Sequence, residues 1–335
     1  MNGRELQAPE GFRRLSLDDR AILEPFLLAS GRQSCEFAFA NLFLWSGTYR
    51  PDWCFIGSHL YLLLETEDIL MFAPGGARGP TPDELLAVSD RLIRAGYGGS
   101  FDHVDPEYLK THPDVGTRFS AERMDDRYDE YIYCVDALVG LHGRLLAKKR
   151  NLIAQFCEDY PDAALEPLSR ANLDEALAVQ RDWLAAQDQP VSTEAAHEAA
   201  AIGMLAEHFE ALPVEGLVLR AGGRVISFAV YSPVSPDLWT VHFEKTRYEY
   251  KGASQFITHK TAAALQGRAR LLNREQDLGI PGLRQAKKSY DPLFLLQNYK
   301  LIRRARNGKP HMKHRQDMDV RRIRSILPIS SAVPG

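Results

Sequence analysis

The sequence predicts an α+β protein made of two similar halves, each a mixed sheet flanked by helices. Two observations carry this prediction. The same order of expected elements, helix, hairpin, strand, helix and strand, occurs twice with an offset of about 155 to 170 residues. The chain has 335 residues, of which 45% are hydrophobic and 25% charged, so it is long enough to bury two cores. Because the halves share little identity, the repeat rests on element order.

The first half begins with a capping box. Ser16 and Asp19 have the spacing that predicts a helix start, and Pro82 after a threonine predicts a second start that Gly96 ends. A Gly-Ser turn between two apolar runs predicts a hairpin. Helices are therefore expected at 16–29 and 82–96, and strands at 53–56, 59–64 and 69–73.

The second half repeats this order. Ser169 predicts a helix start, and an Ala-Gly-Gly turn at 221–223 joins two apolar runs into a clear hairpin. Helices are expected at 169–186, 194–212 and 253–265, and strands at 216–220, 224–231, 238–243, 269–273 and 295–302.

A linker helix is expected between the halves, from Leu138 to Phe156. Its apolar residues fall on one stripe at helical spacing, and His142 and Lys149 project close to that stripe. We favour the interpretation that Lys149 extends its ammonium group to water along apolar surface. The alternative is that His142 and Lys149 face a cleft between the halves.

The expected organisation has four parts: an N-terminal unit (1–137), the linker helix (138–160), a C-terminal unit with the active site (161–303) and a basic tail (304–335). Nine cations lie between Arg303 and Arg324, against two aspartates. A solvated, disordered tail is the favoured interpretation, and docking onto anionic lipid or RNA is the alternative.

Charge and hydropathy exclude several classes. A net charge of −3 and a pI near 6.4 argue against a protein that coats nucleic acid, and no DNA partner is expected. No apolar run approaches the roughly 20 residues that span a bilayer. The N-terminus lacks an apolar signal core, so we expect a cytoplasmic protein, with a peripheral position at the inner membrane as the alternative.

Familiar metal and nucleotide motifs are missing. The four cysteines form no C-x-x-C pair, the ten histidines form no H-E-x-x-H, and no G-x-x-x-x-G-K-[ST] loop occurs. No metal site is therefore predicted. A zinc or nucleotide hydrolase would have to use an unrecognised site.

The most informative segment is 269–292. A short apolar strand runs into Asn273, Glu275 and Asp277, and Arg284 and Lys287 follow a loop with two glycines and a proline. Loops carried by a rigid sheet often hold functional groups, so this segment is the candidate site. A salt-bridged strand end that orders a turn carries about equal weight.

The same segment carries a family resemblance. The run at 273–287, with Ser-Tyr-Asp-Pro at 289–292 and Asn-Tyr-Lys at 298–300, resembles a bacterial family of unassigned function. That family is grouped with the C-terminal domain of phosphatidylglycerol lysyltransferases. The runs at 39–45, 148–151 and 241–245 also fit, so the resemblance covers roughly 36–303.

The resemblance implies a doubled GNAT fold, as in the Fem-type aminoacyltransferases. GNAT folds bind the acyl donor where the third strand meets the next helix, here at Lys251 and Gly252. The alternative, that Gly252 only begins a helix and binds no ligand, carries equal weight. His242 and Glu244 share one strand face and Lys245 the other. The run His-Phe-Glu-Lys at 242–245 departs from the Asp-x-x-Arg pattern expected of the lysyltransferases. This departure leaves lysine and phosphatidylglycerol open as substrates.

Two roles are assigned to the candidate residues. Catalytic candidates are Glu244, Glu275 and Asp277, and the sequence does not rank them as the base. Substrate-binding candidates are His242, Lys245, Lys251, Gly252, Asn273, Arg284, Lys287 and Lys149.

The favoured function is acyl transfer, from aminoacyl-tRNA to a lipid or small-molecule acceptor, without a further cofactor. One alternative is a coenzyme A-dependent N-acetyltransferase, with acyl-coenzyme A as donor. Another is a non-catalytic doubled GNAT scaffold that binds an anionic ligand, since folds outlive functions. The number of charged residues expected in the second-half cleft favours an enzyme.

Overall fold

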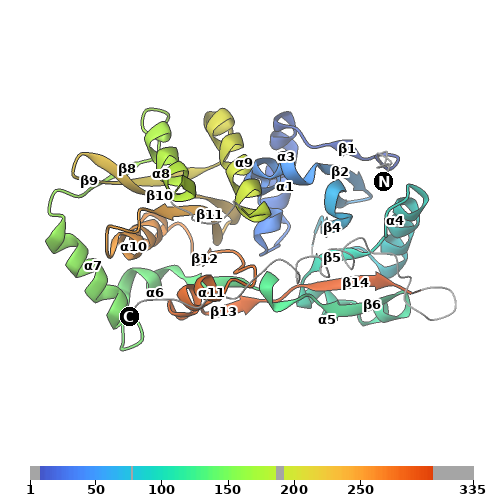
Figure 1. Cartoon of the computed structure of the whole chain (residues 1–335). Helices are drawn as coiled ribbons and strands as arrows, with labels where there is room; N and C mark the ends of the chain where they lie inside the picture. The colour runs from blue at the N-terminus through green and yellow to red at the C-terminus, as the bar shows by residue number, and fades with distance from the viewer. Residues whose placement is uncertain (1–7, 77, 186–191, 305–335) are drawn as a thin grey trace.

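Two mixed sheets form the scaffold of the protein, and helices flank both (Figure 1). The computed structural model describes residues 8–76, 78–185 and 192–304. Within these ranges the first sheet has the order β1-β2-β3-β4-β5-β14-β6, and the second has the order β13-β7-β12-β11-β10-β9-β8. The predicted α+β class with two mixed sheets is confirmed.

Most predicted elements of the first half are present. The capping box at Ser16 and Asp19 opens a short 3-10 turn that leads into α1, and a second box at Thr81 and Glu84 opens α4. The strands are β1 (Arg13–Arg14), β2 (Pro51–Ile56), β3 (His59–Leu64), β4 (Ile69–Ala73), β5 (Phe101–Val104) and β6 (Phe119–Arg123). The helices are α1 (Arg20–Ala29), α2 (Phe39–Leu44), α3 (Ser46–Tyr49), α4 (Pro82–Arg94) and α5 (Pro106–Thr111).

The second half is built around a long hairpin, whose turn contains Gly222 and Gly223 at positive φ. Its strands are β7 (Glu130–Cys134), β8 (Ala164–Pro167), β9 (Glu215–Ala221), β10 (Arg224–Ser235), β11 (Leu238–Thr246), β12 (Leu271–Asn273) and β13 (Phe294–Leu296). Its helices are α6 (Val135–Gly140), α7 (Ala147–Asp159), α8 (Leu173–Ala185), α9 (Thr193–His208), α10 (Ala253–Leu265) and α11 (Pro281–Lys288).

The two sheets exchange strands. The strand predicted at 295–302 is two strands: β13 pairs with β7 in the second sheet, and β14 (Tyr299–Arg303) pairs with β5 and β6 in the first. The chain passes from one sheet to the other at Asn298, which lies between β13 and β14. The side chain of Asn298 donates a hydrogen bond to Glu130. The unpredicted β7 inserts between β12 and β13. Sheet membership therefore differs from the expected 1–137 and 161–303 division, and residues 305–335 of the expected tail lie outside the described ranges.

The predicted linker helix is wrong as a single element. Helix α6 ends at Gly140, Leu141 adopts a left-handed conformation with φ of 45°, and α7 begins at Ala147. A residue with positive φ cannot continue a right-handed helix, so the apolar stripe is interrupted. Leu145 is 74% exposed in the intervening loop, although the stripe predicted it to be buried.

One hydrophobic cluster joins the two halves. Leu23, Phe37 and Leu62 of the first half cluster with Leu205 and Phe243 of the second. Helix α9 of the second half lies beside α3 and α2 of the first, and Figure 1 shows α9 next to α3. Each sheet buries its other face against its own helices. None of the described helices is long and apolar enough to cross a membrane.

The parallel strands β11 and β12 diverge, and this divergence places the candidate site. They pair at only three positions, the last of which joins Thr240 to Asn273. Beyond it β11 continues to Thr246, while the chain after β12 turns into a loop that leads to α11. Side chains after Thr240 and Asn273 therefore meet in the opening between the two strands.

Candidate functional site

An ion pair spans the opening between β11 and β12. The guanidinium of Arg274 lies 2.9 Å from Oε1 of Glu244, and the hydroxyl of Thr258 on α10 donates to the same oxygen at 2.9 Å. The other carboxylate oxygen of Glu244, Oε2, is buried and has no hydrogen-bond partner among the described residues. A buried carboxylate oxygen without a donor is costly, so this oxygen is suited to receive a donor from a ligand.

Two tyrosine rings and a lysine complete this side of the site. Arg274 lies 5.0 Å from the ring centroid of Tyr290 and 5.9 Å from that of Tyr133. The ammonium of Lys149 on α7 lies 4.2 Å from the Tyr290 ring centroid. Burial, together with Arg274, lowers the pKa of Lys149. Lys149 is thus buried at the site instead of extending to water, while His142 lies exposed in the loop before α7.

On the other side, Glu275, His242 and Ser232 form a hydrogen-bonded chain. Nδ1 of His242 lies 3.3 Å from Oε1 of Glu275, and its Nε2 lies 2.8 Å from the hydroxyl of Ser232. The side chains of Ser232 and His242 are fully buried, whereas that of Glu275 is 20% exposed. Glu275 is therefore the end of the chain that a substrate can reach.

The backbone of Glu275 is held in an uncommon conformation, with φ of 55°. Its amide donates to Oδ1 of Asn273 at 2.7 Å, and its carbonyl accepts from the amide of Tyr131 at 3.3 Å. A left-handed conformation costs free energy in a residue other than glycine, and such strain is often found at functional sites. The fold thus fixes the direction of the Glu275 side chain.

Behind Glu275 lies a buried polar node centred on Glu130. Its carboxylate accepts from the side-chain amide of Asn273 at 2.6 Å, from that of Asn298 at 3.2 Å and from the Cys35 amide at 2.8 Å. Burial raises the pKa of Glu130, although these donors oppose the shift. Because the three donors come from both halves, the node joins the halves directly behind the candidate site.

A second carboxyl group, that of the partly buried Glu36, lies beside this node. Burial, together with Glu130 and Glu275, raises the pKa of Glu36 to about 8. Its carboxyl oxygens accept from the side-chain amides of Asn41 at 3.1 Å and Gln276 at 3.4 Å. Burial also raises the pKa of the neighbouring Cys35 thiol. At neutral pH, Glu36 is thus largely protonated and the Cys35 thiol is not an activated nucleophile.

Asp277 is committed to internal contacts. Its side chain is 1% exposed and accepts from the Tyr131 hydroxyl at 2.7 Å, the Gly279 amide at 2.8 Å and Arg284 at 2.8 and 3.1 Å. Burial raises its pKa, but these donors outweigh burial, and the pKa of Asp277 is lowered. Arg284 also binds Asp126 at 3.0 Å. These contacts fix the loop before α11 and leave Asp277 no free oxygen for a substrate.

Lys287 closes the loop from α11. Its buried ammonium donates to the carbonyl oxygens of Arg274 and Gln276, both at 2.5 Å. Burial lowers its pKa to about 8. Lys287 therefore holds the backbone that presents Arg274 and Glu275.

Three predicted binding residues lie outside this cluster. Lys245 pairs with Glu198 of α9 at 2.7 Å, and Lys251 is exposed in the turn before α10. Gly252 adopts φ of 86°, and a Cβ there would lie 2.2 Å from the carbonyl oxygen of Leu152. The close approach that Gly252 permits is thus to α7.

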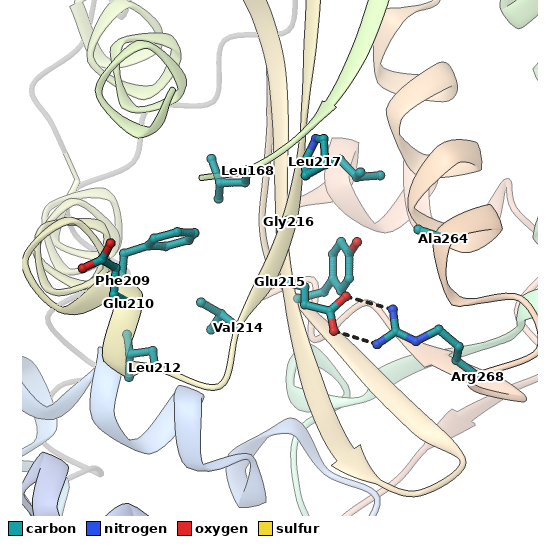
Figure 2. Close-up of a pocket in the computed structure, with 12 residues that line it drawn as sticks. Leu168, Phe209, Glu210, Leu212, Val214, Glu215, Gly216, Leu217, Ala264 and Arg268 are labelled. Atoms are coloured by element: carbon teal, nitrogen blue, oxygen red, sulfur yellow. Dashed lines mark hydrogen bonds and ion pairs between the residues drawn. The ribbon is translucent and has the colours of Figure 1, made fainter. Parts of the chain in front are cut away.

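A separate cavity of about 470 Å³ lies away from these residues, between the segment 209–214, the start of β9, Tyr231 in β10 and the end of α10. Figure 2 shows its apolar lining, with Phe209 and Val214 on one side. Three charged residues line it: Glu215 and Arg268 pair through two contacts of 2.6 and 2.8 Å, and Glu210 is exposed. Because Glu215 and Arg268 satisfy each other and Glu210 is exposed to solvent, the candidate site remains at Glu275.

Sequence reasoning named Arg274 only as part of the charged run and did not single out four further site residues: Glu36, Glu130, Ser232 and Thr258. One signal was available, because Glu130 is an acidic residue at the start of the apolar run Tyr-Ile-Tyr. An acidic residue in a buried strand normally has dedicated partners. Ser232 and Thr258 are common residue types in strands and helices and gave no signal.

Comparison with known proteins agrees with this architecture. The family model for the C-terminal domain of phosphatidylglycerol lysyltransferase matches residues 29–302. A conserved protein of unknown function from Bacteroides thetaiotaomicron is 26% identical, with a TM-score of 0.81 over 87% of this chain and 98% of that one.

Two further solved structures share the fold. The C-terminal domain of a putative lysylphosphatidylglycerol synthetase from Agrobacterium fabrum is 15% identical, with a TM-score of 0.61 over 88% of this chain and 94% of that one. FemX is 9% identical, with a TM-score of 0.56 over 86% of this chain and 96% of that one. The doubled GNAT fold expected from the sequence is thereby confirmed. With more than half of its length matched by the family model, the chain belongs to the family of the C-terminal domain of phosphatidylglycerol lysyltransferases.

Proposed function

We propose that this protein is an acyltransferase that moves an aminoacyl group from aminoacyl-tRNA to the hydroxyl or amine of an anionic lipid, with Glu275 as the base. One observation carries the proposal. Where β11 and β12 diverge, a partly exposed carboxylate with a buried histidine behind it lies beside a partly buried ion pair, formed by Arg274 of the same loop and Glu244 of β11. Acyl transfer needs a base, a stabilised oxyanion and positioning, and this arrangement supplies a candidate for each.

In the proposed step, Glu275 accepts the proton of the acceptor hydroxyl as its oxygen attacks the ester carbon. The tetrahedral intermediate then collapses, the bond to the 3′ oxygen of the terminal adenosine breaks, and that oxygen takes up the proton. His242, 3.3 Å from the carboxylate, orients Glu275. Ser232 is fully buried and serves to hold the imidazole.

The ion pair has two roles in this proposal. Oε2 of Glu244 receives the α-ammonium of the aminoacyl group, since it is buried without a donor among the described residues. The Arg274 guanidinium stabilises the developing oxyanion, because its pKa is raised and it stays charged at every accessible pH. The rings of Tyr133 and Tyr290 shield this charge from water.

The packing of α7 bears on the donor. A GNAT fold that uses coenzyme A holds the pyrophosphate at the turn before the helix equivalent to α10. Here Gly252 in that turn abuts Leu152 and Phe156 of α7, and the Phe156 ring lies 5.0 Å from that of Phe256 in the first turn of α10. Because α7 covers one side of this turn, the arrangement supports an acyl donor that does not bind at the turn before α10.

An exposed apolar segment supports a lipid acceptor. Five of the eleven exposed large apolar side chains in the described ranges lie within residues 278–294. Leu278, Ile280 and Leu283 are 45%, 52% and 36% exposed, and they flank the loop held by Asp277. Exposed apolar groups beside a polar site are typical of surfaces that contact a membrane or a protein.

The test is transfer of label from a pool of charged tRNA into the organic phase, with purified protein and anionic phospholipid vesicles. A parallel reaction supplies labelled acetyl-coenzyme A and a bacterial small-molecule extract. Repetition with single tRNAs identifies the amino acid. The matched variants are Glu275→Gln and Glu122→Gln, since Glu122 is exposed on β6 away from the site.

We expect lipid-soluble label from charged tRNA, lost in Glu275→Gln and retained in Glu122→Gln. Label from acetyl-coenzyme A alone would replace the proposal with a coenzyme A-dependent acetyltransferase. No label from either donor, across anionic lipids and extract, would favour a binding protein.

A further inference from the structure

A polar pocket of about 440 Å³ lies between the first half and β13 of the second half, apart from the proposed acyl-transfer site. The segment after α1, the end of β5, the start of α5, and β13 with its connection to β14 form its walls. Its residues include Arg32, His103, Asp105 and Phe294. Asn298, at its edge, is shared with the buried node around Glu130.

His103 is unusual in two ways, and both lie at this pocket. Its backbone has φ of 54° within strand β5, a conformation that costs free energy in any residue other than glycine. It is also 6% exposed, and its buried Nδ1 has no hydrogen-bond partner in the described part of the chain. Burial, with Arg32 and Lys300, lowers its pKa to about 4, so the ring is neutral at pH 7 and can accept a hydrogen bond. Strain and an unmade hydrogen bond on one residue point to a ligand-binding role.

Two opposite charges are fixed side by side in the same wall. Nη1 of Arg32 donates to Asp105 at 2.5 Å, and Nε and Nη2 each donate one hydrogen bond to the carbonyl of Phe72. Two of the five N–H groups of Arg32 are left without a described partner. Its guanidinium is packed between the rings of Phe37 and Phe72, at 4.8 and 4.7 Å. Asp105 is 31% exposed and caps α5 through its other oxygen.

The adjacent charges define the ligand. A cation and an anion in contact complement a molecule whose own anion and cation are attached to one carbon atom. Phe294 and Leu295 line the same pocket and offer apolar contact for a side chain. We propose that this pocket binds a free α-amino acid as its zwitterion, with the carboxylate at Arg32 and the ammonium shared between Asp105 and His103. This proposal does not rest on the proposed acyl transfer.

The experiment is titration calorimetry of the full chain with the twenty amino acids, followed by a pair of isomers. Norleucine and 6-aminohexanoate have the same atoms, but only norleucine carries both charges on one carbon. We expect saturable binding of norleucine or another apolar α-amino acid, and at least about tenfold weaker binding of 6-aminohexanoate, because its charges cannot reach both partners together.

Two variants test the residues. His103→Gly removes the imidazole, and its relief of the positive φ offsets part of the cost of the cavity that the ring leaves. Asp105→Asn keeps a capping side chain but removes the charge. Each should weaken binding at least about tenfold, whereas His142→Ala, in an exposed loop, should not change it. No saturable binding of any amino acid, equal binding of the two isomers, or full binding by His103→Gly would each overturn the proposal.

Discussion

The contacts of Asp277 predict a structural role that a single substitution can test. Asp277→Ala removes the acceptor of the buried Tyr131 hydroxyl, of the Gly279 amide and of Arg284. A buried hydroxyl left without a partner costs about 1–3 kcal/mol. Arg284 keeps Asp126 and is 29% exposed, so the loss of its contact with Asp277 adds little. The expected loss of unfolding free energy is therefore about 2 kcal/mol. At about 2.1 cal/mol/K per residue, the unfolding entropy of a chain of 335 residues is roughly 0.7 kcal/mol/K, so the melting temperature should fall by roughly 3 °C.

The assay is urea unfolding at pH 7 and pH 3, with Asp159→Ala as the control, since Asp159 is exposed at the end of α7. The pKa of Asp277 is lowered, so its stabilisation is fully present above the unfolded-state pKa and is lost as pH falls through the folded-state pKa. The difference between wild type and Asp277→Ala should therefore shrink at pH 3. A variant that unfolds within about 1 kcal/mol of wild type at pH 7, yet has lost its activity, would refute the reasoning and return Asp277 to the reacting groups.

Three further predictions concern other parts of the molecule. The pKa of Glu36 is raised to about 8, so between about pH 4.5 and 8 the folded protein holds a proton that the unfolded chain has lost, and its stability falls as pH rises. Urea unfolding of Glu36→Gln should show a smaller fall in stability over this range. A pH dependence identical to that of the wild type would contradict the prediction. Gly252→Ala should lower the melting temperature by several degrees, through its positive φ and the contact with Leu152; an unchanged melting temperature would show that α7 moves freely. Ile280→Ser with Leu283→Ser should weaken sedimentation with anionic vesicles without changing stability, since both side chains are exposed; unchanged sedimentation would remove the support for a lipid acceptor.

The fold was largely predictable because local patterns specify most of its elements. The capping box at Ser16, the helix start at Pro82 and the hairpin turn at 222–223 are present where the sequence predicts them. The strand exchange was not predictable, because it depends on pairing between residues more than 100 positions apart, such as Ile132 with Phe294. Local periodicity contains no information on such partners. It also did not reveal that Leu141 would interrupt the linker helix.

The candidate site was half predictable. The charged run after β12 indicated Asn273, Glu275, Asp277, Arg284 and Lys287, and the structure gathers all of them around one loop. Their different roles could not be inferred, because a role depends on which oxygens remain free after folding. Asp277 and Glu275 are two positions apart, yet one is fully bound inside the protein and the other reaches the surface.

The central claim is that Glu275 is the base of an aminoacyl transfer. The most direct measurement is the single-turnover rate of label transfer from charged tRNA to lipid, compared between Glu275→Gln and wild type with stability measured in parallel. Loss of a general base predicts a rate lower by about 10²–10⁴-fold with unchanged unfolding free energy. A Glu275→Gln variant that transfers label at the wild-type rate would contradict the account.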